Sequence, residues 1–125
     1  MAAGPLRVLF CMEVTQNFFD LPKSAHPEVF AAFGRTREDL KGRFNIQVLG
    51  TIDDDQIAVG PALGRTWTSY ILADCPDYDT VAAFCNQFRT TVIGDGPDIL
   101  WKYARVEARI GRPLSFEKLA LAAKA

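Results

Sequence analysis

The stretch from Asp98 to Ile110 constrains the fold more than any other part of the chain, because its alternate positions carry different chemistry. One set of positions holds Trp101, Tyr103, Arg105, Glu107 and Arg109, and the positions between them are mostly small or β-branched. Successive side chains of a strand point to opposite faces, so this pattern predicts a long strand with one apolar face. The other face combines aromatic residues with both signs of charge, which is compatible with a solvated face, a pocket or a subunit interface.

The length and composition predict one globular domain. The chain has 125 residues, of which 49% are hydrophobic and 23% charged. We expect a single domain over residues 1–125, with a core of about residues 6–112 and a helical tail over 113–125. The formal net charge of -1 gives no electrostatic reason to expect nucleic acid as a partner. No apolar run approaches the roughly 20 residues of a membrane-spanning helix, and the start lacks the pattern of a signal peptide, so neither is expected.

Cysteine and histidine usage predicts neither a disulfide framework nor a metal site. The three cysteines are far apart in the sequence, at Cys11, Cys75 and Cys85. They are expected to be free thiols in a reducing compartment, which makes the cytoplasm the default location. His26 is the only histidine, and the acidic run Asp53–Asp55 lacks the glycine and distal glutamate of a calcium loop. No phosphate-binding glycine motif is present either, so an enzyme here is expected to work without a metal or cofactor.

Hydrophobic patterns along the chain predict the order strand, helix, strand, strand, helix, strand. The run Arg7–Val14 is apolar on both faces, which is typical of a central strand. The other predicted elements are a helix from His26 to about Lys41, strands at Phe44–Thr51 and Thr66–Ala73, a helix containing Val81, Phe84, Cys85 and Phe88, and a tail helix from Ser115 to about Lys124. This order predicts a ferredoxin-like βαββαβ sandwich of the α+β class, with both helices on one face of the sheet.

The predicted sheet has a helix-facing side and an uncovered side. Alternation assigns to the helix-facing side Val8, Phe10, Met12, Phe44, Ile46, Val48, Val106, Ala108 and Ile110. It assigns to the uncovered side Cys11, Glu13, Gln47, Tyr70, Trp101, Tyr103, Arg105 and Glu107. A large face with Trp and Tyr needs a cover, and a second copy of the chain is the simplest one. Two such sheets packed face to face form a dimeric α/β barrel.

Five segments add a family resemblance that extends from about residue 7 to 112. They are Arg7–Met12, Gln16–Pro22, Leu49–Asp55, Tyr70–Asp74 and Leu100–Arg112. With the order of elements, they resemble the dimeric α/β-barrel superfamily and, more narrowly, the IacB-like family associated with bacterial indole-3-acetate degradation. The resemblance implies a homodimer. The superfamily includes cofactor-free monooxygenases, isomerases and decarboxylases of small, often aromatic compounds, as well as haem enzymes, but no catalytic residue carries over.

The uncovered face supplies the candidate catalytic residues. Glu13 and Glu107 are expected on neighbouring strands, where burial raises the pKa of a carboxylate and a nearby arginine lowers it. A carboxylate whose pKa is raised toward neutrality is suited to proton transfer. His26, whose unperturbed pKa lies near physiological pH, is a third candidate. The alternatives are an interface ion-pair network for the two glutamates and a surface or capping role for the histidine.

The same face supplies the candidate ligand-binding residues. Tyr70 and Tyr103 are expected to donate hydrogen bonds, Trp101 to flank an aromatic ring, and Arg105 to hold a carboxylate. Two functions follow. The first is a small cofactor-independent enzyme or pathway accessory acting on an aromatic or indolic molecule by proton transfer or oxygenation. The alternative is a non-catalytic homodimer that binds such a compound.

Overall fold

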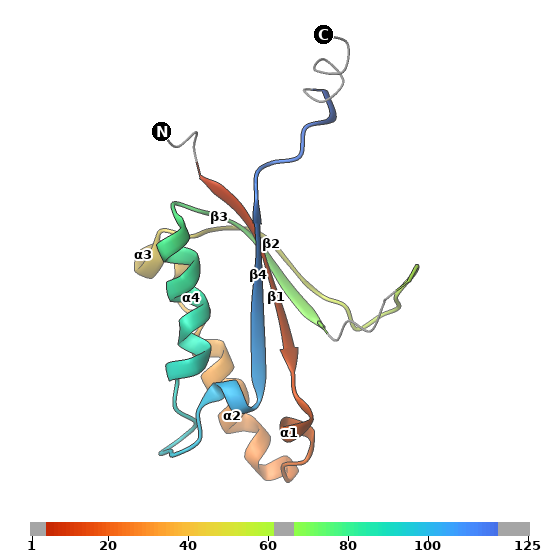
Figure 1. Ribbon diagram of the computed structural model, residues 1–125. Coiled ribbons are helices and arrows are strands. Elements are labelled where there is room, and N and C mark those ends of the chain that lie inside the picture. Colours follow the sequence, from red (N-terminus) through yellow and green to blue (C-terminus); the bar gives the residue numbers. More distant parts are fainter. Residues whose placement is uncertain (1–4, 62–66, 118–125) are drawn as a thin grey trace.

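The chain folds into one antiparallel sheet with a layer of helices on one side of that sheet, as seen in the computed structural model (Figure 1). The structure describes residues 5–61 and 67–117. The strands are β1 (Leu6–Val14), β2 (Gln47–Asp53), β3 (Ser69–Cys75) and β4 (Ala104–Gly111). The helices are α1 (Gln16–Phe19), α2 (His26–Arg35), α3 (Leu40–Phe44) and α4 (Tyr78–Thr90), with short 3-10 turns η1 (Lys23–Ala25) and η2 (Leu100–Lys102).

The strand order defines the fold as ferredoxin-like α+β. The four strands lie in the order β2-β3-β1-β4, and each neighbouring pair is antiparallel. This order, with α2 and α4 as the two crossover helices, is that of a split βαβ sandwich. The predicted fold class is therefore confirmed. So is the central position of β1 and β3, which follows from the apolar run in β1, since a strand buried on both faces carries apolar residues at successive positions.

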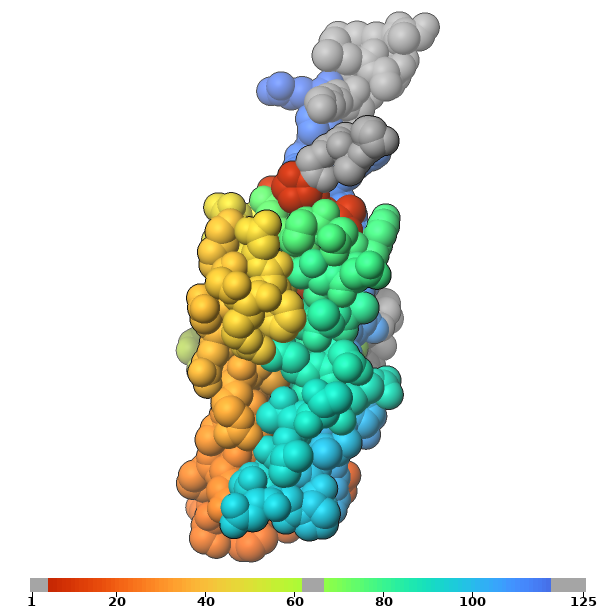
Figure 2. All heavy atoms as spheres, turned by 90° about the vertical axis from the view of Figure 1, so that its left-hand side faces the viewer, coloured from red at the N-terminus to blue at the C-terminus, as the bar shows by residue number. Residues whose placement is uncertain are grey.

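The core lies between the sheet and the helix layer. Figure 2 shows α3 above α2, with α4 alongside both, in this layer. From β1, alternate residues Val8, Phe10 and Met12 point into the layer and are at most 1% exposed. The ring of Phe84 in α4 is fully buried, with its centroid 4.4 Å from that of Phe10. This pair locks α4 against the centre of the sheet, because large buried rings contribute much of the packing energy of a small domain.

The first predicted helix is shorter than expected. It ends at Arg35, and a new helix, α3, begins at Leu40. The buried Thr36 hydroxyl donates to the Phe33 carbonyl oxygen at 2.6 Å, which competes with the regular helical bonding pattern. Asp39 then adopts a left-handed conformation, and its carboxylate caps α3 by accepting from the Gly42 backbone N–H. Phe44 consequently belongs to α3 and not to the second strand, which begins at Gln47.

Two residues of the predicted helix-facing side are partly exposed. The pairing register puts Val48 opposite Ala73 and Ile110 opposite Val8, so both lie on the predicted side, yet each is 42% exposed. Val48 lies in the edge strand β2 at a bulge between Val48 and Gly50, and Ile110 is near the end of the other edge strand. The predicted tail helix to about Lys124 lies largely in residues 118–125, outside the described residues, and stays a prediction.

Candidate functional site

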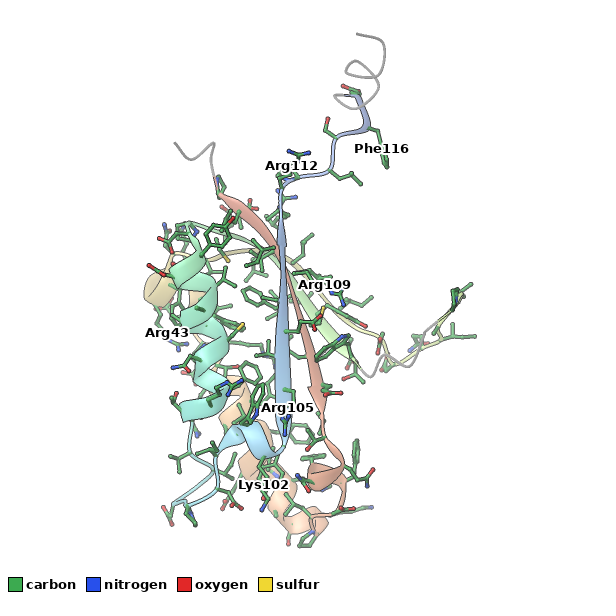
Figure 3. All side chains as sticks on the ribbon, in the orientation of Figure 1. Arg43, Lys102, Arg105, Arg109, Arg112 and Phe116 are labelled. Atoms are coloured by element: carbon green, nitrogen blue, oxygen red, sulfur yellow. The ribbon has the colours of Figure 1, made fainter. Side chains whose placement is uncertain are left out.

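No helix of the described residues covers the second face of the sheet, which we call the open sheet face (Figure 1). Its members alternate with the core positions of each strand and follow from the pairing register. They are Arg7, Leu9, Cys11 and Glu13 of β1, Gln47, Gly50 and Ile52 of β2, Tyr70, Leu72 and Asp74 of β3, and Arg105, Glu107, Arg109 and Gly111 of β4. In Figure 3 Arg109 lies on the side of β4 away from the helices.

Four of the predicted site residues share this open sheet face. Cys11 is the direct partner of Tyr70 on one neighbouring strand and of Glu107 on the other. One row further along, Glu13 is opposite Arg105. Directly opposed side chains on a sheet lie within contact distance, so the structure brings together Glu13, Tyr70, Arg105 and Glu107, as the alternation predicted.

Two polar groups of the open sheet face already have partners within the protomer. The Glu107 carboxylate accepts from the Arg109 guanidinium at 2.9 Å. The Tyr70 hydroxyl donates to the Asp54 carboxylate at 3.1 Å. Burial raises the pKa of Tyr70 above its usual value, and the hydrogen bond to Asp54 raises it further, so the phenol stays neutral. Tyr70 is therefore a hydrogen-bond donor and not a base.

The prediction that Trp101 and Tyr103 belong to the final strand is wrong. Trp101 lies in η2, and β4 begins only at Ala104. The turn forms because Leu100 is fully buried and its carbonyl oxygen accepts from the Tyr103 backbone N–H at 2.8 Å. This local turn breaks the two-residue period, so the Tyr103 ring enters the core. Its side chain is 3% exposed, and its hydroxyl donates to Asp98 at 2.8 Å.

His26 does not join the glutamates on the open sheet face. It is the first residue of α2, in the helix layer, and its ring stacks on Phe18 with centroids 4.1 Å apart. The His26 Nε2 atom lies 3.1 Å from the Phe18 carbonyl oxygen. The structure thus gives His26 contacts that anchor the loop before α2, in line with its structural alternative.

A hollow borders α4, η2 and β4, and it contains the displaced Trp101. We call it the Trp101 hollow; its volume is about 250 Å³. It is lined by Ala82, Cys85, Asn86, Arg89, Trp101 and Val106. The Arg89 guanidinium carbon lies 4.3 Å from the centroid of the Trp101 ring. Arg105, which was expected to line a ligand site itself, instead supports Trp101: its Nε donates to the Trp101 carbonyl oxygen at 2.7 Å, and its guanidinium carbon lies 4.6 Å from the ring centroid.

The Cys85 thiol, which lines this hollow, is a weak nucleophile. Burial, with a smaller contribution from the neighbouring Cys75, raises the pKa of Cys85 to about 11. A thiol with such a pKa is protonated at neutral pH and is a poor nucleophile. Cys85 therefore contributes an apolar wall. Cys11 and Cys75 are buried, and all three cysteines are free.

Sequence reasoning missed Arg89, although a signal for it was present. Ala82, Cys85, Asn86 and Arg89 have the spacing of one helical face, and all four line the hollow. The pattern that predicted the helix was its adjacent apolar stripe, which includes Val81, Phe84 and Phe88. Which strand the second stripe meets depends on the crossover of α4 onto β4, and that is a tertiary property.

Two kinds of site are absent from the described parts of the chain. No group of three or more His, Cys, Asp or Glu residues is placed to hold a metal ion among residues 5–61 and 67–117. Within these same ranges, no helix combines the length and the apolar character needed to cross a membrane.

Comparisons with known proteins do not assign the chain to a family. No family model matches the chain, and no curated protein matches its sequence. One solved structure that it resembles is that of a dimeric protein of unknown function and ferredoxin-like fold from Bacteroides fragilis NCTC 9343. The identity is 13%, the match covers 87% of this chain and 98% of that chain, and the TM-score is 0.42. At these values the similarity adds nothing to the fold class, which rests on the strand order, and the narrower resemblance to the IacB-like family stays a prediction.

Proposed function

We propose that this protein is a non-catalytic homodimer that binds a small aromatic molecule, with two copies packed through their open sheet faces into a dimeric α/β barrel. The observation that carries the dimer is the open sheet face itself. The helices α2, α3 and α4 lie on the opposite side of the sheet. The uncovered side still exposes 37% of Leu72 and 58% of Ile52. Contiguous apolar surface of this kind marks an interaction site in a water-soluble protein.

The distribution of side chains supports a sheet-to-sheet interface. The apolar residues Leu9, Leu72 and Ile52 lie on the three strands β1, β3 and β2, and charged residues lie among them on β1 as well as on the edge strand β4. Protein interfaces combine apolar contacts with polar and charged groups in this way. Gly50 adds room, because a Cβ atom built there meets nothing within 4 Å.

Binding is favoured over catalysis because only two of the three predicted catalytic residues, Glu13 and Glu107, share a face. His26 lies in the helix layer, and Glu107 is paired with Arg109. A general base has to lie within hydrogen-bond reach of the proton that it removes, and the Glu107 carboxylate already accepts from the Arg109 guanidinium. The enzyme remains the second candidate, since Glu13 and Glu107 do lie on neighbouring strands of one face. In that case the chemistry is proton transfer or oxygenation of an indolic compound in a catabolic pathway.

The oligomer is tested with two glycine substitutions that are matched in their surroundings. Gly50→Glu places a charged side chain on the open sheet face, and Gly34→Glu places the same side chain on α2. At both positions a new Cβ has open space within the protomer. Sedimentation equilibrium is expected to show a dimer for the wild type and for Gly34→Glu, and a monomer for Gly50→Glu. A monomeric wild type at micromolar concentration would refute the dimer.

Binding and turnover are tested together. Calorimetric titration of the wild type with indole-3-acetate and related aromatic acids is expected to give saturable binding. Mass spectrometry of the same mixtures is expected to recover the ligand unchanged after long incubation. Conversion of the ligand that Glu107→Gln abolishes would favour the enzyme, and absence of binding by every aromatic acid would end the proposal.

A further inference from the structure

We propose that the Trp101 hollow is the ligand site of this protein, and that its ligand is a small aromatic carboxylate whose carboxylate group pairs with Arg89. This inference rests on the proposed function, to which it adds the place of binding and the chemical class of the ligand. It moves the anion-binding role from Arg105, which sequence analysis predicted, to a residue of α4.

The charge of Arg89 is available to a ligand. The ion pairs of the described residues join Arg7 to Asp74, Lys102 to Asp98 and Arg109 to Glu107, and none of them involves Arg89. The side chain is nevertheless held in place, because its guanidinium lies on the Trp101 ring. A guanidinium ordered by stacking loses less conformational entropy when it binds a carboxylate, and its fork can bind both oxygens.

The hollow beside this charge suits an aromatic body. Ala82, Cys85 and Val106 form its apolar wall, with Trp101 on one side. Its volume of about 250 Å³ lies below the roughly 300 Å³ at which sites for drug-sized ligands begin, so it fits a one- or two-ring molecule. Asn86 supplies an amide N–H at the same border. An apolar wall with one cationic end selects a ligand that is flat and apolar at one end and anionic at the other.

Arg105 holds Trp101 in position. The Arg105 Nε atom binds the Trp101 carbonyl oxygen, and its guanidinium also contacts the indole ring. Arg105 does not line the hollow, so it is a positioning residue. Loss of either arginine is expected to change the environment of Trp101, because both guanidinium groups lie on its ring. Only loss of Arg89 also removes a charge that lines the hollow, so it is expected to lower affinity more.

The lining residues also fit binding without turnover. None of the six carries a carboxylate or an imidazole, and the Cys85 thiol is protonated at neutral pH. A bound carboxylate therefore meets no general acid or base in the hollow.

The test uses full-length protein with Trp67→Phe, which leaves Trp101 as the one tryptophan. Phenylacetate is titrated while Trp101 fluorescence and heat are recorded. We expect Arg89→Ala to weaken binding about ten-fold or more, as for a lost charge-assisted contact, and Arg89→Lys to recover part of the loss. Arg37→Ala is the matched control, because Arg37 also lies over a ring, 5.2 Å from the Phe33 centroid, but does not line the hollow. Phenylacetamide and acetate, which lack the charge and the ring respectively, are expected to bind more weakly than phenylacetate.

Alkylation of Cys85 reports the location of the ligand independently of affinity. Saturating phenylacetate is expected to slow modification of Cys85, measured by peptide mass, and to leave Cys11 and Cys75 unchanged. If the wild type binds aromatic acids but Arg89→Ala binds equally well and Cys85 is not protected, the site is wrong and the proposed function stands. If no aromatic acid binds the wild type, both fail. Circular dichroism of each variant confirms that a loss of affinity is not a loss of fold.

Discussion

Truncation of Leu72 to alanine tests the sheet-to-sheet dimer quantitatively. Full burial of a leucine side chain contributes about 1.5–3 kcal/mol. In one copy, 37% of Leu72 remains exposed, so its further burial at an interface contributes about 0.6–1.1 kcal/mol from each copy. A two-fold dimer contains this contact twice, which gives about 1–2 kcal/mol in total. Leu72→Ala should therefore raise the dimer dissociation constant by about 5- to 30-fold.

Sedimentation equilibrium over a range of protein concentrations measures this change. Val92→Ala is the control, because Val92 is 43% exposed but lies outside the open sheet face, in the connection after α4. Thermal unfolding of both variants at one dilute concentration separates a weaker dimer from a less stable protomer. Equal dissociation constants for Leu72→Ala and Val92→Ala would refute burial of the open sheet face.

Three further predictions concern the fold that supports the site. Phe84→Ala should lower the free energy of unfolding by about 3–5 kcal/mol in urea, because it leaves a cavity between α4 and the sheet, whereas a loss below 1 kcal/mol would contradict this packing. Tyr103→Phe should lower the free energy of unfolding by about 1.5–3 kcal/mol, the usual cost of losing a hydrogen bond to a charged group. Burial and Asp98 raise the pKa of Tyr103, so its stabilisation is present below the ordinary tyrosine pKa and is lost as the pH rises through the pKa of the folded protein. The Tyr103→Phe variant should not show this loss at high pH. Asp77 caps α4 by accepting hydrogen bonds from Thr80, which lowers the pKa of Asp77. The cap therefore stabilises the fold above the ordinary aspartate pKa, and its contribution disappears as the pH falls through the lowered pKa. Asp77→Ala should reduce the loss of stability at acid pH, and an unchanged pH dependence of unfolding would rule the cap out.

Local patterns in the sequence determined the fold class. The run Arg7–Val14 is apolar at successive positions, and only a central strand of a sheet buries both faces of a strand. The spacing of Val81, Phe84 and Phe88 made α4 predictable in the same way, since one face of a helix repeats every three to four residues. The alternation from Ala104 onward placed Arg105 and Glu107 on the face that the structure gives them.

Tertiary structure decided where Trp101 and Tyr103 lie. Their alternate positions fit a strand, but the buried Leu100 begins a turn that interrupts the period and sends one ring into the core and the other against α4. The Trp101 hollow could not be predicted from either contributing stretch, because it exists only where the stripe Ala82–Arg89 crosses η2 and β4. A hydrophobic period reports which residues of one element share a face. Which two faces meet depends on the competition among all elements for a single core, and that competition is resolved only when the whole chain packs.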